Sequence, residues 1–141
     1  MGQQQLLLVI LVTIIVGIAT VVAINTFGSS AEQANLDAVR QDIAQIATAA
    51  QAWYVRPTML EGGGNSFTGL TFNSLSFAAD TVYNSGLTAE NANGVYVLAI
   101  DGGGQSFTVE ASPTSQANLP ATEQLEITGT VTPNNLSLET E

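Results

Sequence analysis

The chain has 141 residues, with 2 basic and 12 acidic side chains, a net charge of −10, and neither histidine nor cysteine. This balance excludes a nucleic-acid partner, because phosphate binding needs clustered basic side chains. The usual ligands of zinc, haem and iron–sulfur centres are missing, and so is the histidine of a nucleophile–histidine pair. The scattered carboxylates form no recognisable catalytic motif, so we expect no enzyme, no catalytic residue and no cofactor.

An uncharged apolar run occupies residues 6–24, LLLVILVTIIVGIATVVAI. As a helix it would be about 28 Å long at ~1.5 Å per residue, close to the hydrocarbon thickness of a bilayer. Fourteen of its 19 residues are Leu, Ile or Val, and it lacks the polar face of a helix in a soluble core. A cleaved secretory signal would have a basic start, a shorter apolar core and a small-residue exit, none of which is present. The run therefore predicts a membrane-spanning helix.

A second helical pattern follows a short polar segment at residues 25–30. Ser29 with Glu32, and Ser30 with Gln33, have the spacing of a capping box. Apolar residues then recur at intervals of three and four until Pro57 ends the pattern, which predicts one buried helix face. The residues of this expected helix–sheet core are Leu36, Val39, Ile43, Ile46, Ala50 and Trp53.

The polar segment between the two patterns has two interpretations. Asn25, Gly28, Ser29 and Ser30 are poor helix formers that cost up to ~1 kcal/mol each relative to alanine. They favour a local break of the helix in the assembled state, which is the interpretation we prefer. Packing on both sides can instead carry the helix straight through, because propensity is weak against packing.

Strand signals appear in the second half of the chain. Two alternating runs, residues 94–101 and 105–111, flank three glycines and predict a β-hairpin. Residues 124–132 alternate as a half-buried antiparallel strand, and Leu136 with Leu138 suggests a short last strand. Residues 58–93 are irregular, with short strand or helix pieces. About 85 residues make too thin a sheet to bury both faces, so the helix stripe should cover one of them.

We therefore predict an α+β fold in which a long N-terminal helix, apolar in its first half and amphipathic in its second, packs on a small antiparallel sheet. Alternation alone leaves the inward face of the first hairpin strand open. Val95, Val97 and Ala99 form one set, and their alternates form the other. The other inward candidates are Phe107, Val109, Leu125, Ile127 and Val131.

A short internal echo links EGGGNSFT at residues 61–68 with DGGGQSFT at residues 101–108. Glu61 and Asp101 are weak calcium candidates, because a calcium loop needs several oxygen ligands, usually with more than one carboxylate. Flexible loop tips are the simpler interpretation, and no metal is expected. Asn135-Leu136-Ser137 is a glycosylation sequon of a kind that often occurs by chance.

With these elements placed, the chain resembles the type IV pilins and the related pseudopilins of type II secretion. The resemblance rests on Gly2 before Gln3, the place of the prepilin-peptidase cut, on the apolar run directly after it with Gly17 inside, and on the helix to Trp53 followed by a β-meander. In the order of its elements the resemblance covers the whole chain, and in its sequence motifs it covers about the first 30 residues. It implies a leader remnant at 1–2, an apolar transmembrane and filament-core helix at 3–28, an amphipathic helix half at 29–56 and a β-rich globular head at 57–141.

The chain departs from the bacterial pilins at one position of that motif. Most of them carry a glutamate five residues into the mature chain, which pairs with the amino terminus of a neighbouring subunit. Counted from Gln3 that position is Leu7, and counted from the glycine alignment it is Leu8. We therefore expect no such salt bridge and assign both leucines to filament-core packing. Archaeal pilins, which often begin with glutamine at the cut, are a second family to compare.

Close packing between copies of the apolar helix needs small side chains. The segment offers four of them, Gly17, Ala19, Thr20 and Ala23. A contact between different faces of identical copies does not close and so produces a helical filament. The same segment can thus lie in a membrane before assembly and in a filament core afterwards.

The resemblance implies a structural subunit of an extracellular filament of the type IV pilus kind, with roles such as cell adhesion. Its partners would be further copies of itself, the prepilin peptidase and the pilus assembly machinery. It would be held in the inner or cytoplasmic membrane as a precursor, cut between Gly2 and Gln3, N-methylated, and then exported to the cell surface. The alternatives are a pseudopilin of a type II secretion system and a monomeric, membrane-anchored extracellular binding module.

Overall fold

A computed structural model describes residues 2–141 as one helix followed by a sheet. The helix α1 runs Gly2–Val55. The chain divides into two compact units within this helix, the first ending at Ala34 and the second running Asn35–Glu141. Each unit is described by itself below.

The first unit is the N-terminal part of α1. The helix continues without interruption through residues 25–30. The expected local break is thus not found in the single chain, because the propensity costs of the four polar residues are small beside the cooperative hydrogen bonding of a long helix. The hydroxyl of Thr26 also bonds the carbonyl oxygen of Val22 at 2.9 Å, as an additional link within this stretch. A break in the assembled state stays a prediction.

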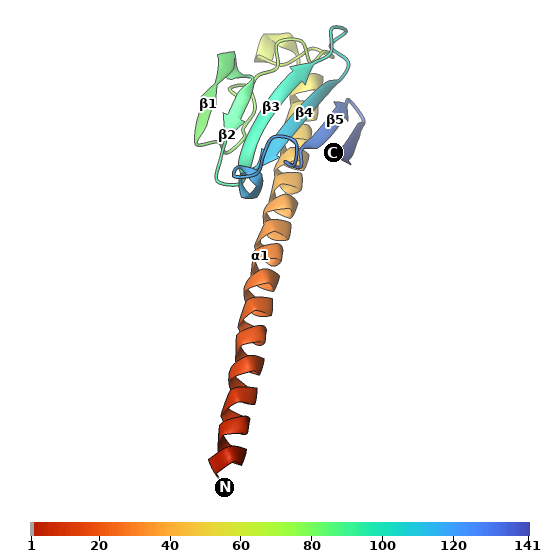
Figure 1. Ribbon diagram of the computed structural model, residues 1–141. Coiled ribbons are helices and arrows are strands. Elements are labelled where there is room, and N and C mark those ends of the chain that lie inside the picture. Colours follow the sequence, from red (N-terminus) through yellow and green to blue (C-terminus); the bar gives the residue numbers. More distant parts are fainter. Residues whose placement is uncertain (1) are drawn as a thin grey trace. The chain divides into compact units, whose positions relative to one another are not determined.

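The second unit contains a six-stranded antiparallel sheet in the simple order β1–β2–β3–β4–β5–β6 (Figure 1). Short 3₁₀ turns η1, η2 and η3 cover Thr58–Leu60, Asn84–Gly86 and Thr114–Gln116. The strands are β1 Thr81–Tyr83, β2 Thr88–Glu90, β3 Gly94–Ile100, β4 Phe107–Pro113, β5 Ile127–Thr132 and β6 Asn135–Thr140.

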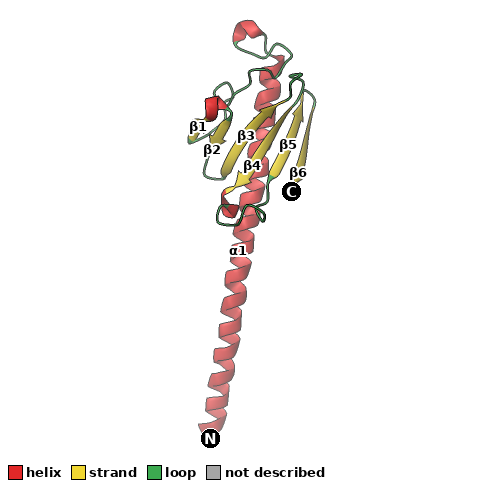
Figure 2. Ribbon diagram, turned by 45° about the horizontal axis from the view of Figure 1, so that its top comes forward, coloured by secondary structure: helices red, strands yellow, loops and turns green. Residues whose placement is uncertain are grey.

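The sheet lies against one side of the C-terminal part of α1, with its other face uncovered (Figure 2). The helix contributes its apolar stripe to the core, where Leu36, Val39, Ile43, Ile46, Ala47, Ala50 and Trp53 are buried. A Cβ atom at Gly129 would stand 2.6 Å from Cγ2 of Ile43. Glycine at this position of β5 therefore lets the strand approach the helix closely.

The strand register decides which side chains face α1. Tyr96 of β3 is aligned with Ala111 of β4 and, through it, with Ile127 of β5, and all three are buried. Leu98, Val109 and Phe107 also lie in the core. The inward set of β3 is thus the alternate one, while Ala99 is exposed and Val95 and Val97 are only half-buried. Leu125 precedes β5 and is half-buried.

These elements confirm the α+β fold with a long N-terminal helix packed on an antiparallel sheet. The hairpin predicted around Gly102–Gly104 is β3 and β4. The strand predicted over 124–132 begins three residues later, at Ile127, and the short last strand is longer than expected. In the irregular stretch 58–93, two three-residue strands extend the sheet.

Candidate assembly surfaces

The N-terminal part of α1 presents an uncharged apolar surface. No charged side chain occurs among residues 2–31, and the large apolar side chains from Leu6 to Phe27 are between 48% and 75% exposed. Leu7 and Leu8 belong to this surface, and Gly2 and Gln3 lie exposed at the start of the helix. By length and composition, α1 is a candidate membrane span. The segment therefore presents to its surroundings what a soluble helix would bury.

The hydroxyl groups of this segment are already satisfied within the helix. Thr13, Thr20 and Thr26 each donate a hydrogen bond to the carbonyl oxygen four residues earlier, at 2.8–2.9 Å. A hydroxyl bonded in this way needs no partner from solvent, so it can enter an apolar environment at little cost. These bonds make the segment compatible with lipid or with other helices along its whole length.

Three of the four small residues predicted to pack between copies lie along one side of α1. Gly17, Thr20 and Ala23 follow one another at intervals of three residues and so occupy neighbouring positions on the helix surface. Ala19 lies next to Ala23 but nearly opposite Gly17. A Cβ atom at Gly17 would meet nothing within 4 Å. The side is therefore open within a single chain, and another helix could approach it closely.

In the second unit, a cluster of polar side chains fastens the β2–β3 turn to α1. Oδ2 of Asp42 accepts hydrogen bonds from Nδ2 of Asn91 at 2.9 Å, from Nδ2 of Asn93 at 2.8 Å and from the hydroxyl of Tyr96 at 2.6 Å. Asn35, seven residues and two helical turns before Asp42, donates from its amide to the carbonyl oxygen of Asn93 at 2.9 Å. This cluster lies at the edge of the apolar stripe and fixes the position of the helix along the sheet.

The hydrogen bonds set the charge state of the cluster. Burial by itself would raise the pKa of Asp42, but the bonds from Asn93, Tyr96 and Asn91 together outweigh burial and lower the pKa below its ordinary value of 3.8. Burial, followed by the bond to Asp42 and its negative charge, raises the pKa of the Tyr96 hydroxyl. The pair is therefore a carboxylate with a neutral phenol donor across the neutral pH range. Sequence reasoning missed it, because the partners are 49 to 54 residues apart.

Further polar bonds fasten α1 to the opposite end of the sheet. Nε2 of Gln51 donates to the carbonyl oxygen of Thr132 at 3.0 Å, next to the β5–β6 turn. The hydroxyl of Tyr54 bonds Oε1 of Gln105 at 2.9 Å, next to the β3–β4 turn. The helix is thus held at both ends of the sheet by groups that flank its apolar stripe.

The two echoed loops come together in space. The amide of Phe67 bonds the carbonyl oxygen of Gly104 at 2.7 Å, and the rings of Phe67 and Phe107 are 4.9 Å apart at their centroids. Gly64 and Gly104 occupy equivalent positions of the echo and share the left-handed conformation, with φ of 58° and 64°. Both echoed loops therefore form the same kind of turn, and the two turns pack against each other within one chain. Sequence reasoning did not predict this contact.

The calcium alternative gains no support from this contact. Across the described residues 2–141, no group of three or more acidic side chains is placed to hold a metal ion. Oδ2 of Asp101 accepts the amide of Gly103 at 3.3 Å, as in an ordinary turn, and Glu61 is exposed. Asn135, the acceptor of the sequon, is exposed at the start of β6.

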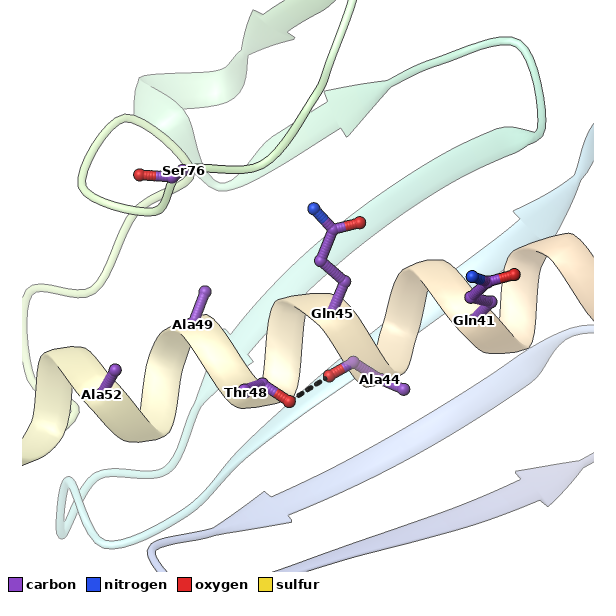
Figure 3. Close-up of a pocket in the computed structure, with 7 residues that line it drawn as sticks. All are labelled: Gln41, Ala44, Gln45, Thr48, Ala49, Ala52 and Ser76. Carbon is purple, nitrogen blue, oxygen red and sulfur yellow. Dashed lines mark hydrogen bonds between the residues drawn. The ribbon is translucent and has the colours of Figure 1, made fainter.

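A shallow hollow lies on the side of α1 that faces away from the sheet (Figure 3). Its volume is about 650 Å³. Gln45 and Ala49 point toward the loop that carries Ser76, which forms the opposite wall. None of the lining residues is charged, and they are Gln41, Ala44, Gln45, Thr48, Ala49, Ala52 and Ser76. On an acidic chain, this is a surface that another acidic molecule can approach without direct repulsion between carboxylates.

Comparisons with protein-family models, with curated proteins and with solved structures found no match.

Proposed function

We propose that the protein is the structural subunit of an extracellular filament of the type IV pilus kind, which polymerises through the N-terminal part of α1. The observation that carries the proposal is the exposed, uncharged surface of residues 2–31 on a chain whose core is complete without it. All members of the hydrophobic core cluster lie at or beyond Leu36. The core of the second unit is thus formed without the apolar segment, and lipid or copies of the segment itself would cover its exposed surface.

The hydrogen-bonded threonines and the small residues suit the segment to packing against copies of the same helix as well as to contact with lipid. Lipid accepts any apolar helix, whereas close helix packing also needs small side chains on one side. The segment has both properties. We therefore assign it first to the cytoplasmic or inner membrane, as a precursor, and afterwards to the filament core.

The amino-terminal motif supports the same assignment. Gly2 and Gln3 stand directly before the apolar run, where a prepilin peptidase would cut and where N-methylation would follow. Leu7 and Leu8 replace the glutamate of most bacterial pilins, so entry into the filament would depend on apolar packing and not on an ion pair with a neighbouring amino terminus. The assembly machinery would then supply the ordered addition of subunits.

Two other functions use the same surfaces. A pseudopilin of a type II secretion system would assemble in the same way but remain in a short filament within the cell envelope. A monomeric, membrane-anchored binding module would use the segment only as an anchor and would present its sheet to an external ligand.

The test is to shear intact cells, collect the released high-molecular-weight material and image it by electron microscopy. We expect filaments that contain the full chain, identified by mass spectrometry of the released fraction. A protein that stays with the membranes and is released only by detergent would contradict the filament and favour the anchor. Detection of short filaments only in the cell envelope would favour the pseudopilin.

A further inference from the structure

The turn between β2 and β3 contains the single asparagine–glycine pair of the chain, Asn93–Gly94. In such a pair the backbone nitrogen of the glycine can attack the side-chain amide carbon of the asparagine, because glycine has no side chain to hinder the approach. A new N–C bond closes a cyclic imide, the C–N bond of the side-chain amide breaks, and ammonia leaves with the proton of the glycine amide. Water then opens the imide at either carbonyl and gives aspartate or isoaspartate.

Both residues of this pair are needed by the fold. A Cβ atom at Gly94 would stand 2.6 Å from the carbonyl oxygen of Ser112, so glycine lets β3 and β4 approach closely at this point. Nδ2 of Asn93 donates to Oδ2 of Asp42 at 2.8 Å, and a side chain without the amide would leave this carboxylate one donor short. The reactive sequence therefore lies where neither residue can be exchanged without loss.

The folded turn keeps the two reacting groups apart. The amide of Gly94 donates to Oδ1 of Asn91 at 3.1 Å, so the proton that must leave before the attack is held in a hydrogen bond. The side chain of Asn93 is bonded to Asp42 on α1, and its carbonyl oxygen accepts the amide of Thr114 at 2.9 Å. Gly94 is also buried at the first position of the β3–β4 ladder. Ring closure needs rotation about the bonds of Asn93, so the turn must first open.

We propose that Asn93 is a modification site that stays intact in the folded second unit and deamidates once the β2–β3 turn opens. The product has a carboxylate where Asn93 had a hydrogen-bond donor. Asp42 would then meet a like charge in place of that donor. The isoaspartate product also lengthens the backbone by one carbon directly before β3. A chain that has opened for long enough would therefore not dock this turn on α1 again.

The groups that hold the turn all belong to the second unit, from Asn35 onward. Asn35 itself donates to the carbonyl oxygen of Asn93 at 2.9 Å, so α1 holds the turn through two of its side chains. The modification is thus expected whether or not the chain forms filaments.

Three other asparagines provide a comparison within the same chain. Asn65, Asn73 and Asn84 are each followed by serine, whose small side chain permits the same attack but hinders it more than glycine does. All three are exposed in the folded chain, whereas Asn93 is half-buried and bonded. Sequence alone thus predicts that Asn93 reacts first, and the structure predicts that folding protects Asn93 most.

The experiment incubates the full chain in detergent at mildly alkaline pH, once folded and once in guanidinium chloride. Digestion after glutamate separates residues 91–110, which contain Asn93, from residues 62–90, which contain the three serine-followed asparagines. Tandem mass spectrometry locates the modified residue and gives its rate. We expect folding to slow the reaction at Asn93 by about a hundredfold or more, and the reaction in 62–90 by about tenfold or less. Protection of Asn93 no greater than that of the other three would overturn the proposal.

A variant that loosens the turn gives a second readout. Asp42→Asn removes the charge from the bonds that hold Asn93, so the folded-state rate at Asn93 should rise about tenfold, with no change in residues 62–90. Asp37→Asn, which removes the exposed carboxylate paired with Arg40, is the matched control and should leave both rates unchanged. Trp53 fluorescence verifies folding, since this tryptophan is buried in the core. Equal folded-state rates at Asn93 in the two folded variants would also overturn the proposal.

The effect of the product on docking is tested by refolding. After long incubation in guanidinium chloride and removal of the denaturant, we expect intact Asn93 in the folded fraction and modified Asn93 in the unfolded fraction. Asn93→Asp reproduces one product directly and should lower the denaturant midpoint or prevent folding. Asn73→Asp, the same change at an exposed asparagine, should leave the midpoint unchanged. Equal midpoints for the two variants, or equal modification in the two fractions, would show that the product docks as the natural turn does and would overturn this step.

Discussion

Asp42 receives three donors at one oxygen atom, and each donor belongs to the β2–β3 hairpin. A carboxylate suits this position because its negative charge strengthens all three hydrogen bonds, which a neutral amide oxygen would not do. Hydrogen bonds to a charged group are worth more than neutral ones, so the cluster concentrates stability at a single side chain.

Asp42→Asn should lower the free energy of unfolding by about 1.5–3 kcal/mol at pH 7, because it removes the charge from these bonds. The folded-state pKa of Asp42 lies below its ordinary value. Its contribution is therefore present above the unfolded-state pKa and is lost as pH falls through the folded-state pKa. The natural protein should lose this part of its stability on acidification below about pH 4, and the variant should not. Denaturant titrations of the full chain in detergent, followed by Trp53 fluorescence, measure both effects.

The control for this experiment is Asp37→Asn, which removes an exposed carboxylate from a surface ion pair with Arg40. Such pairs contribute little, so the change should stay within about 0.5 kcal/mol. Parallel pH profiles for the natural protein and Asp42→Asn would show that the cluster does not depend on charge.

Ile46 tests the interface between helix and sheet. Its side chain is fully buried, so Ile46→Asp would place an unpaired charge in the core and cost several kcal/mol. Gln45→Asp, one residue away on the exposed face, should cost within about 0.5 kcal/mol. Thermal or denaturant unfolding followed at Trp53 compares the two. Equal stabilities of the two variants would mean that the apolar stripe of α1 does not form part of the core.

Among the elements, the N-terminal part of α1 would, under the proposed function, enter two environments with different requirements. Membrane insertion depends on average apolarity, whereas a helix bundle depends on how closely the helices approach. We therefore expect the small side chains to be dispensable for insertion and needed for assembly.

Gly17→Leu, or Ala19→Leu, should leave membrane insertion intact and reduce filament yield. Leucine fits Gly17 in the single chain, where a Cβ meets nothing within 4 Å, so any loss arises between chains. Carbonate extraction of membranes measures insertion, and the sheared fraction measures assembly. Leu11→Ile, a change without gain in size, is the control. Undiminished filament yield in both leucine variants would place the packing elsewhere on the helix.

The sequence was informative wherever a periodic pattern was long. The stripe from Leu36 to Trp53 and the alternation across residues 94–111 predicted the helix face and the central hairpin. The face of β3 was left open, because Val95 and Tyr96 are both apolar enough to be buried. Tyr96 faces inward, where its hydroxyl reaches Asp42. The strands β1 and β2 were missed as such, since three residues carry no measurable period.

The candidate surfaces also divide into those that the sequence predicts and those that it does not. The exposed apolar segment follows directly from composition. The Asp42 cluster and the paired echo loops depend on residues 37 to 54 positions apart, and the hollow depends on which side of α1 the sheet leaves open. Local sequence patterns do not predict contacts between residues so far apart, so these contacts are seen only in the folded chain.

For the whole molecule, charge is the dominant long-range property. Each copy has a net charge of −10, so adjacent heads in a filament repel one another over roughly a Debye length, ~30 Å at 10 mM salt and ~8 Å at 150 mM. Filaments should therefore be more stable at the higher ionic strength. Sedimentation of sheared material at the two salt concentrations measures the remaining polymer. A larger soluble fraction at 150 mM would indicate that attraction between opposite charges on adjacent heads outweighs the repulsion.

The positions of the two arginines, Arg40 within α1 and Arg56 directly after it, have a consequence for resistance to proteases. The chain has no lysine, so trypsin-like proteases depend on Arg40 and Arg56, and the bond after Arg56 leads into Pro57, which such enzymes do not cut. The bond after Arg40 lies in the middle of α1, between the buried Val39 and Ile43. Cleavage there requires the helix to leave the sheet and extend, an opening nearly as costly as unfolding the head. Trypsin should therefore leave the folded protein intact for hours and cut Ile46→Asp quickly, so the fold itself would determine how long a filament persists among digestive enzymes.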